Sequence, residues 1–542
     1  MPTLQFKGKT FVQNHHLAVK YHQLIPNSEL SMTDRVSLHD NLIIHGDNLK
    51  VLKALLPNYA GKVKCIYIDP PFNTGNENWV YNDNVSSPMI KEWLGSVVDR
   101  EDMTRHDKWL CMMMPRLKLL HELLSEEGAI FISCDDNEQH NLRCLLDEVF
   151  GEHNFIQNII WQKKFSPQND AKYFSDNHDF IICYAKNKIE GEQTFGWVRN
   201  LIPRGEANDE RYSNPDDDPR GAWTSSDMTV KTYSVEYDYE ITTPNGKRIK
   251  PARGRCWFTS KDNFKQLVHD KRVWFGKNGN NIPRIKKFLS EVQDGIVPIS
   301  IWLHTEVGHN QQAKQELKQI FNEVDLPFDT PKPVSLIKRI IQLSANKNDI
   351  ILDSFAGSGT TAQAVLELNK EDGGNRKFIL VEQEDYANTI TAERVRRVIK
   401  GVKTAKSDML KNGTGGTFTY FQLGAAIEME AILTQNALPS YLEFARYLFY
   451  TATGEQFDEE VMNLETGFIG ESRCYEVFLF YKDDIEWLKQ HALTLDQCRN
   501  FPKFNGKQRL VFAPAKYVDD FTCLVHRIDF CQLPYEIYRI QK

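Results

Sequence analysis

Five short apolar runs limit the folds open to this chain. Each run is nearly continuous rather than alternating, which is typical of strands buried on both faces of a sheet. The runs cover residues 63–68, 129–134, 180–185, 350–352 and 378–381. Amphipathic helical stretches lie between some of them, at residues 49–56, 109–124, 335–343 and 360–368. This alternation predicts an α/β fold with a doubly wound, mostly parallel sheet.

The α/β pattern is interrupted once and then ends. A chain of 542 residues has room for three or four folding units. From Gly191 to Ile301 turns and polar loops replace the pattern, and the Gly-rich stretch 412–416 is typical of a linker. Strand-like aromatic runs follow that linker at 475–481 and 509–512. The predicted domains are a first α/β part at 1–190, an insert at 191–301, a second α/β part at 302–405 and a C-terminal accessory domain at 406–542.

Positive charge is concentrated in the insert. A net charge of −7 ordinarily disfavours binding to nucleic acid. Between Lys247 and Lys287, however, thirteen Lys or Arg stand against two Asp, which gives this segment +11 and leaves −18 on the rest. The cations are interleaved with four aromatic residues, Trp257, Phe258, Trp274 and Phe275. We interpret the segment as a DNA contact rather than a solvated charged face.

Several classes of protein are disfavoured. The ten cysteines show no C-x-x-C and no Cys/His spacing of the zinc type, so we expect neither a disulfide framework nor a structural metal. The cluster 216–218 of three Asp is flanked by prolines, which favours a turn over a metal site. No stretch approaches the roughly 18 apolar residues of a membrane span, and residues 1–10 lack the core of a secretory signal. We therefore expect a cytoplasmic protein that contacts no membrane.

The first chemical motif is Asp69-Pro70-Pro71-Phe72, directly after the run that ends at residue 68. It falls at the carboxyl edge of the predicted sheet, where open α/β folds bind ligands. The Asp69 carboxylate and the Pro70 carbonyl, whose direction Pro71 fixes, can accept hydrogen bonds from an exocyclic amine and favour its nucleophilic form. Phe72 offers a flat face for an extruded base. The alternative is a Pro-Pro strand stop with an incidental Asp.

The second motif is a Gly-rich turn that follows another predicted strand and opens a helix. Such a turn lets the backbone approach a ligand, and the helix N-terminus favours a carboxylate or phosphate. Glu382 ends the next strand, about where an acidic residue would bind ribose hydroxyls. The candidate ligand-binding residues of the motif are Asp353, Phe355, Gly357, Gly359 and Thr360. A plain tight turn, or a dinucleotide fingerprint made by Gly357-x-Gly359-x-x-Ala362 with Glu382, remains an alternative.

Strand order separates the possible cofactors. An NAD domain needs further strands after the Gly-rich turn, but only the run at 378–381 and a helical stretch follow before the linker. The sheet must therefore be completed by upstream strands, which include the strand before Asp69. Both loops then belong to one sheet and face one crevice. A phosphate-loop NTPase is also disfavoured, because no Gly-Lys-Thr/Ser follows the turn.

Taken together, the motifs resemble those of the β-class amino-methyltransferases of DNA. The resemblance rests on DPPF followed by Asn73-Thr74-Gly75, on FAGSGTT at 355–361 and on a basic insert between them. It implies the S-adenosylmethionine-dependent methyltransferase fold with a target-recognition insert. It also implies S-adenosyl-L-methionine as cofactor, with Asp47 near its adenine and Lys332, within Thr-Pro-Lys-Pro, near its methionine end. Asp before Pro-Pro resembles the adenine-N6 branch more than the cytosine-N4 branch.

A narrower resemblance is to the modification subunits of type III restriction-modification systems. It rests on NPDDDPRGAW at 214–223, on the stretch 301–321 and on the runs LVFAPAKY and QLPYEIYR near the end of the chain. It implies methylation of double-stranded DNA by base flipping and direct displacement, a homodimer, and a helicase-nuclease restriction subunit as partner. The alternative is a DNA-binding specificity subunit that acts mainly through that partner. Cytosine-N4 methylation is a second alternative.

Overall fold

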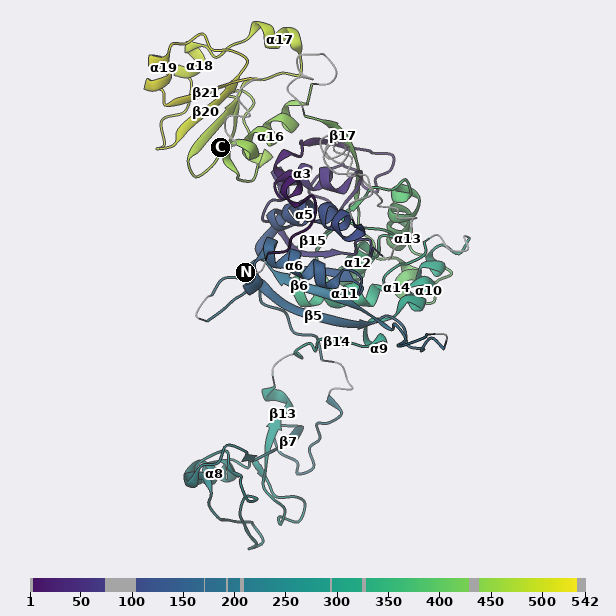
Figure 1. Ribbon diagram of the computed structural model, residues 1–542. Helices are drawn as coiled ribbons and strands as arrows, with labels where there is room; N and C mark the ends of the chain where they lie inside the picture. Colours follow the sequence, from purple (N-terminus) through teal and green to yellow (C-terminus); the bar gives the residue numbers. More distant parts are fainter. Residues whose placement is uncertain are drawn as a thin grey trace. The chain divides into compact units, whose positions relative to one another are not determined.

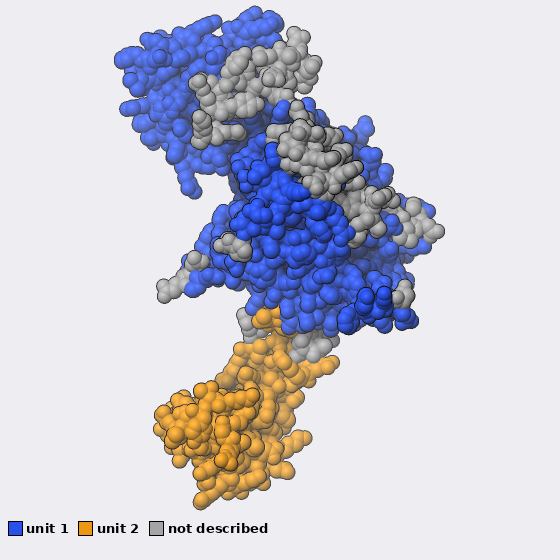
Figure 2. All heavy atoms as spheres, in the orientation of Figure 1, with its two compact units in different colours: residues 1–200, 299–542 blue, residues 201–298 orange. Residues whose placement is uncertain are grey.

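The computed structural model describes eight stretches of the chain, residues 3–73, 104–169, 171–191, 194–204, 209–292, 295–323, 328–427 and 438–533. Thr74-Gly75 and the PYEIYR run lie outside the described residues. The chain divides into two units, residues 1–200 with 299–542, and residues 201–298 (Figure 2). The second unit starts at 201 rather than 191. Residues just before it belong to the first unit, since the Asn200 amide donates to the Leu343 carbonyl at 2.7 Å.

The first unit is built on one ten-stranded sheet (Figure 1). Its order is β1 (His22–Pro26), β17 (Thr419–Ala426), β2 (Leu42–His45), β16 (Lys377–Glu382), β15 (Ile350–Asp353), β3 (Val63–Ile68), β4 (Leu124–Cys134), β6 (His178–Ala185), β5 (Phe155–Gln162) and β14 (Ile301–Trp302). The strands from β17 to β4 are parallel, whereas β1 and β6 run antiparallel to their neighbours. All five predicted strands are present, and the mostly parallel α/β sheet is confirmed.

Strand β17 corrects the predicted domain boundary at residue 406. The prediction put residues 419–426 in the accessory domain, but this strand pairs in parallel with β2, with Thr419 opposite Leu42. The Gly-rich stretch before it is also bonded to the first unit, because the amides of Thr414 and Gly415 donate to the carbonyls of Val398 and Ile399. The main sheet therefore continues past the predicted linker.

Helices cover both faces of the sheet. On one face α3 (Asn48–Tyr59), α5 (Arg105–Leu123) and α6 (Gln139–Phe150) pack in sequence, and on the other α11 (Val334–Ser344), α12 (Thr360–Asp372) and α13 (Glu393–Lys400) do so. The crossover from β3 leads to β4 and that from β15 leads to β16, in opposite directions along the sheet. Because such crossovers are right-handed, their helices lie on opposite faces. The sheet therefore reverses its winding between β3 and β15.

The remaining helices of the first unit are short or peripheral. They are α1 (Lys9–Val12), α2 (His15–Ala18), α9 (His304–Val307), α10 (Asn310–Ile320), the π-helix Ala387–Ala392 and α14 (Asp408–Asn412). In the described part of the chain, no helix combines the length and the apolar character that a bilayer crossing requires.

The second unit consists of small antiparallel pairings around a compact core. Its strands are β7 (Trp223–Asp227), β8 (Thr229–Val230), β9 (Ile241–Thr242), β10 (Arg248–Ile249), β11 (Cys256–Trp257), β12 (Val273–Trp274) and β13 (Arg284–Phe288), and its helix is α8 (Lys261–His269). Trp257 and Phe275 belong to the core of this unit and are buried. These two rings therefore hold the unit together, although the sequence had placed them among the residues of a DNA contact.

The C-terminal part of the first unit carries a second sheet. Its strands, in spatial order, are β18 (Phe468–Glu471), β19 (Tyr475–Leu479), β20 (Gln508–Ala513) and β21 (Ile528–Gln532), and both predicted aromatic runs form strands in it. Its helices are α16 (Tyr441–Thr453), α17 (Ile485–Gln490), α18 (Leu495–Arg499) and α19 (Asp520–Val525). Helix α16 packs against α3, and Phe444 and Leu448 join the core of the main sheet.

Candidate functional site

The two predicted motif loops emerge side by side from the main sheet. β3 and β15 are parallel neighbours, with Ile66 opposite Leu352, so their carboxyl ends share one edge. The DPPF loop follows β3 and the Gly-rich loop follows β15. β16 ends at Glu382 on the far side of β15, and β2, which ends at His45, comes next. The loops meet where the winding reverses, which is the usual ligand site of an open α/β sheet.

Asp69 has one satisfied and one unsatisfied carboxylate oxygen. Its Oδ2 accepts from Lys332 Nζ, whereas its Oδ1 is buried and has no hydrogen-bond partner in the described part of the chain. Burial raises the pKa of Asp69, and the Lys332 ammonium opposes that rise. A buried acceptor without a donor is unfavourable unless a ligand satisfies it. Oδ1 is therefore available to a donor on a ligand.

The rest of the DPPF loop is held from outside the strand. The Trp109 indole donates to the Pro71 carbonyl at 2.7 Å. Asn73 has a positive φ of 57° and donates through its amide to Glu138. No described residue donates to the Pro70 carbonyl, and the half-buried Phe72 ring lies with its centroid 5.0 Å from Lys332 Nζ. The loop is thus held by contacts with Trp109 and Glu138, and the Pro70 carbonyl keeps its acceptor capacity.

Lys332 lies in the segment before α11 and contacts the DPPF loop. Its side chain is 10% exposed and forms the ion pair with Asp69. The sequence predicted only a cofactor contact for this residue, and its pairing with the first motif had no signal in the spacing. The position near the methionine end of a cofactor stays a prediction.

The Gly-rich loop depends on glycine at two positions. Gly357 and Gly359 have φ values of 51° and 79°, which side chains rarely adopt. A Cβ on Gly357 would lie 3.1 Å from Cζ of Phe328, and one on Gly359 would lie 3.0 Å from the Thr391 carbonyl oxygen. Gly359 is also the N-cap of α12 and has no side chain to cap the helix. The first amides of α12 are therefore open to an anionic group.

Asp353 fixes the start of this loop. Its carboxylate accepts from the Thr361 hydroxyl at 2.5 Å and from the Phe355 amide at 3.1 Å. Burial raises the pKa of Asp353 to about 7, and the Asp69 charge adds to the rise. Phe355 itself is buried. Asp353 and Phe355 therefore support the loop from the buried side. Their contact with a ligand stays a prediction.

Glu382 and Asp47 continue the row of acidic residues along the edge. Glu382 is buried and accepts from the amides of Gly357 at 2.7 Å and Glu384 at 3.1 Å. Asp47 caps α3 by accepting from the Lys50 amide at 3.1 Å. The backbone joins the two positions, since the Gly46 amide donates to the Glu382 carbonyl. A carboxylate oxygen can accept more than one hydrogen bond, so Asp47 keeps capacity for a further donor.

Two buried side chains that support the Gly-rich loop were not predicted. Arg394 of α13 is 1% exposed and donates to Ser358 Oγ and Thr360 Oγ1, each at 2.8 Å. Burial lowers the pKa of Arg394 to about 10. From the other face, Asn48 donates to the Ser354 carbonyl at 3.2 Å. In the sequence Arg394 is one of three arginines in a helical stretch, and nothing marks it as the buried one.

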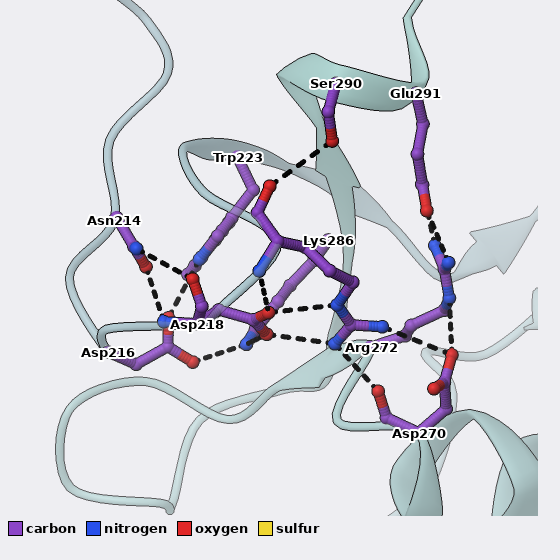
Figure 3. A network of polar contacts seen from close by, with 10 residues as sticks. Asn214, Asp216, Asp218, Trp223, Asp270, Arg272, Lys286, Ser290 and Glu291 are labelled. Carbon is purple, nitrogen blue, oxygen red and sulfur yellow. Dashed lines mark hydrogen bonds and ion pairs between the residues drawn. The ribbon is translucent and has the colours of Figure 1, made fainter.

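The basic segment of the second unit divides into paired and unpaired cations. Lys286 is buried between Asp216 and Asp218, and Arg272 pairs with Asp270 and Glu291 (Figure 3). The contacts of Lys286 tie β13 to the loop before β7. The cations of the β9–β10 hairpin and the turn after it differ. Lys247, Lys250 and Arg253 are exposed, and no described residue forms an ion pair with them.

A family described as DNA methylase matches residues 63–393, more than half of the chain, so the chain belongs to this family. Over 401 residues it is 36% identical to the Mod subunit of the type III restriction-modification enzyme StyLTI from Salmonella typhimurium. That match covers 71% of this chain and 59% of the relative. The EcoPI Mod subunit of Escherichia phage P1 is 31% identical, and that match covers 73% of this chain and 68% of the relative. The predicted resemblance to this family is confirmed, and the chain spans about three fifths to two thirds of these relatives.

Solved structures are similar only at low identity. The crystal structure of the M1.HpyAVI–SAM complex is 15% identical, covers 65% of this chain and 98% of that chain, and gives a TM-score of 0.30. The PvuII DNA methyltransferase, described as cytosine-N4-specific, is 12% identical. That match covers 65% of this chain and 86% of that chain, and its TM-score is 0.34.

Replacing Arg394 tests the support beneath the Gly-rich loop. Arg394→Met should lower the free energy of unfolding by roughly 2–4 kcal/mol, because several buried charge-assisted hydrogen bonds are removed. Thermal unfolding measures the change. Lys400→Met, at an exposed position of the same helix, is the control and should leave the melting temperature unchanged. Equal melting temperatures for the two variants would contradict a supporting role.

Proposed function

We propose that this chain transfers a methyl group from S-adenosylmethionine to the N6 amino group of adenine in duplex DNA, at a specific sequence. The observation that carries the proposal is the buried Oδ1 of Asp69, which has no hydrogen-bond partner among the described residues. Asp69 follows β3, and β3 pairs directly with β15, which leads into the Gly-rich loop. An amino group that donates to this oxygen and to the Pro70 carbonyl becomes a better nucleophile. DNA methylase family membership supplies the reaction class.

The residues present fit the cofactor. Gly357 and Gly359 keep side chains away from the loop surface, and the open amides of α12 suit the carboxylate of the methionine end. Ser354 Oγ is buried with no hydrogen-bond partner in the described chain, a further polar atom that a ligand can satisfy. Glu382 and Asp47 can accept from ribose hydroxyls and the adenine amine. When bound, S-adenosylmethionine supplies an activated methyl group on a positively charged sulfur.

The DPPF loop and Lys332 prepare the amine for attack. Lys332 opposes the effect of burial on Asp69 and so favours the ionised, accepting form of the carboxylate. Phe72 stacks on the extruded adenine and orients its amino group. The amine nitrogen would attack the methyl carbon directly, without a covalent bond to the enzyme. The bond from that carbon to sulfur would break, S-adenosylhomocysteine would leave, and the nitrogen would release one proton. Cytosine-N4 methylation would use the same acceptors, and analysis of nucleosides from methylated DNA separates N6-methyladenine from N4-methylcytosine.

The second unit is proposed as the target-recognition domain. Its exposed cations Lys247, Lys250 and Arg253 can contact the phosphates of duplex DNA. Its paired cations form ion pairs within the unit.

The narrower assignment to a restriction-modification system rests on relatives. The StyLTI and EcoPI proteins are Mod subunits of type III restriction-modification enzymes. We infer that this chain is likewise a modification and specificity subunit, acts as a homodimer and pairs with a helicase-nuclease restriction subunit. The second sheet, β18 to β21, is the proposed accessory domain.

Asp69 and Lys332 should have separable effects on methylation. Asp69→Ala should lower the rate by about two to four orders of magnitude, because the amine loses its acceptor, while cofactor and DNA binding persist. Lys332→Met should raise the pKa of Asp69, since burial is then unopposed. A carboxyl with a higher pKa is protonated at a higher pH, so this variant should lose more activity near pH 6 than near pH 8.5. Radiolabel transfer to DNA measures both.

The proposed mechanism would be refuted by near-normal turnover of Asp69→Ala on purified DNA. Parallel pH profiles of Lys332→Met and the wild type would contradict the role of Lys332. Phe72→Trp is the conservative control and should keep most activity, because it retains a flat ring.

The Gly-rich loop should bind the cofactor only with glycine at its tip. Gly357→Val should abolish S-adenosylmethionine binding in calorimetry, because the side chain adds strain and collides with Phe328. Gly373→Ala is the matched control. Gly373 has a φ of 67° at the other end of α12, and a Cβ there meets nothing within 4 Å. Unchanged binding by Gly357→Val, or stabilisation by NAD instead, would contradict the cofactor assignment.

The hairpin cations should contribute salt-dependent affinity. Replacing Lys247, Lys250 and Arg253 with Ala should weaken binding to all duplexes and flatten the dependence of log affinity on log salt by about 0.9 for each phosphate that the variant no longer neutralises. Fluorescence anisotropy at several salt concentrations measures the slope. The control replaces the exposed Lys482, Lys489 and Lys503 of the C-terminal part with Ala. An unchanged slope in the hairpin variant would identify a merely solvated face.

A further inference from the structure

The loop between β5 and β6, described at residues 163–169 and 171–177, begins at the same edge of the sheet as the DPPF loop. β4 and β5 are both antiparallel to β6, so they point the same way and their carboxyl ends share one edge. Burial is the main cause of the raised pKa of Asp69, and the charge of Asp179, on β6 at the base of the loop, adds to it. The loop therefore projects from the edge where a substrate base must enter.

Polar contacts within the loop fix its two arms. Lys163 Nζ lies 2.8 Å from Asp176 and 2.7 Å from Asp179, and the latter pair is buried. The Asn177 amide donates to the carbonyls of Lys164 and Ser166. These polar contacts hold the two arms of the loop together.

The aromatic side chains of this loop point outward. Tyr173 is 84% exposed and Phe174 is 96% exposed. Phe165 is 53% exposed but packs against the rings of His304 and His309. Because the polar contacts already hold the loop, Tyr173 and Phe174 add nothing to its folding that the structure shows. Two adjacent rings left in water indicate a binding role.

Duplex DNA is the partner that fits these rings. Extruding a base leaves a gap in the stack, and flat apolar side chains fill such gaps or stack on the neighbouring bases. Lys172, exposed and 5.6 Å from the Tyr173 ring, adds a positive charge for the phosphates. A protein partner would bind the rings equally well, but it has no reason to bind at the edge that receives the base.

We propose that Tyr173 and Phe174 enter the DNA stack beside the extruded adenine and stabilise the opened duplex. This inference rests on the proposed function. The two rings are positioning residues, since they act on the neighbouring bases rather than on the reacting atoms. Their contribution should be largest when the base pair that must open is intact.

The test compares two substrates with the double variant Tyr173→Ala/Phe174→Ala. Wild-type protein first methylates genomic DNA, and sequencing identifies the target. On a matched duplex the variant should methylate roughly 10- to 100-fold more slowly, the reduction expected from removing one or two stacked rings. A mismatch at the target adenine makes the base pair easy to open. On a duplex with such a mismatch the variant should methylate at close to the wild-type rate. Tyr173→Trp/Phe174→Trp should keep the wild-type rate on both.

The controls separate this inference from the proposed function. Phe504→Ala/Leu464→Ala removes two exposed apolar side chains of the C-terminal part and should change neither rate. If wild-type protein methylates no DNA, the proposed function fails. The insertion of the two rings is then tested by measuring affinity for a duplex with one abasic site. The wild-type protein should bind this duplex more tightly than the Tyr173→Ala/Phe174→Ala variant does. The inference would be overturned if the double Ala variant and the wild type had equal rates on the matched duplex, or if the variant were slowed equally on both duplexes. If no DNA is methylated, equal affinities of the two proteins for the abasic-site duplex would overturn it.

Discussion

The parallel pairing of β3 with β15 brings two loops together that are far apart in the sequence. Each loop follows a strand end, so both meet at the edge where the winding reverses. The pairing also places Asp69 and Asp353 in one buried region, and the Asp69 charge adds to the raised pKa of Asp353. Lys332 lies between this charge and the Phe72 ring. Burial favours protonation of the Asp69 carboxyl, and the Lys332 ammonium opposes that effect.

The edge is stiff because buried polar groups support it from both faces. Arg394 holds Ser358 and Thr360 from one helix layer, and Asn48 reaches the Ser354 carbonyl from the other. Such groups add little net stability relative to apolar groups of the same size, because their desolvation offsets much of the free energy of their contacts. Removing one is nevertheless costly, because its partners are left buried without a hydrogen bond. Their effect is on geometry: the loop backbone is fixed before any ligand arrives. A fixed loop loses less conformational entropy on binding, which favours ligand affinity.

Local patterns predicted the elements, but not the contacts between them. The five apolar runs are mostly buried, and each forms a strand of the main sheet. Five strands of the main sheet were missed: β1, β2, β5, β14 and β17. β14 has only two residues, and β17 follows a Gly-rich stretch that is typical of a linker. Both motifs were found because each follows a strong strand signal. The Lys332–Asp69 pair and the burial of Arg394 depend on tertiary packing, which sequence spacing does not encode.

The insert shows why counting charges is not enough to define a binding surface. Its positive charge was interpreted as one surface, yet Lys286 and Arg272 are held by acidic side chains from other parts of the unit. An ammonium that already has two carboxylate partners has little attraction left for a phosphate. Arg248 of the β9–β10 hairpin is close to Glu240, but Lys247, Lys250 and Arg253 have no ion-pair partner among the described residues, so their field reaches the solvent. Removing a paired cation would weaken the frame of the unit, whereas removing an unpaired one would change only what the unit attracts. The acidic residues of the NPDDDPRGAW string thus determine indirectly which cations remain free to contact DNA.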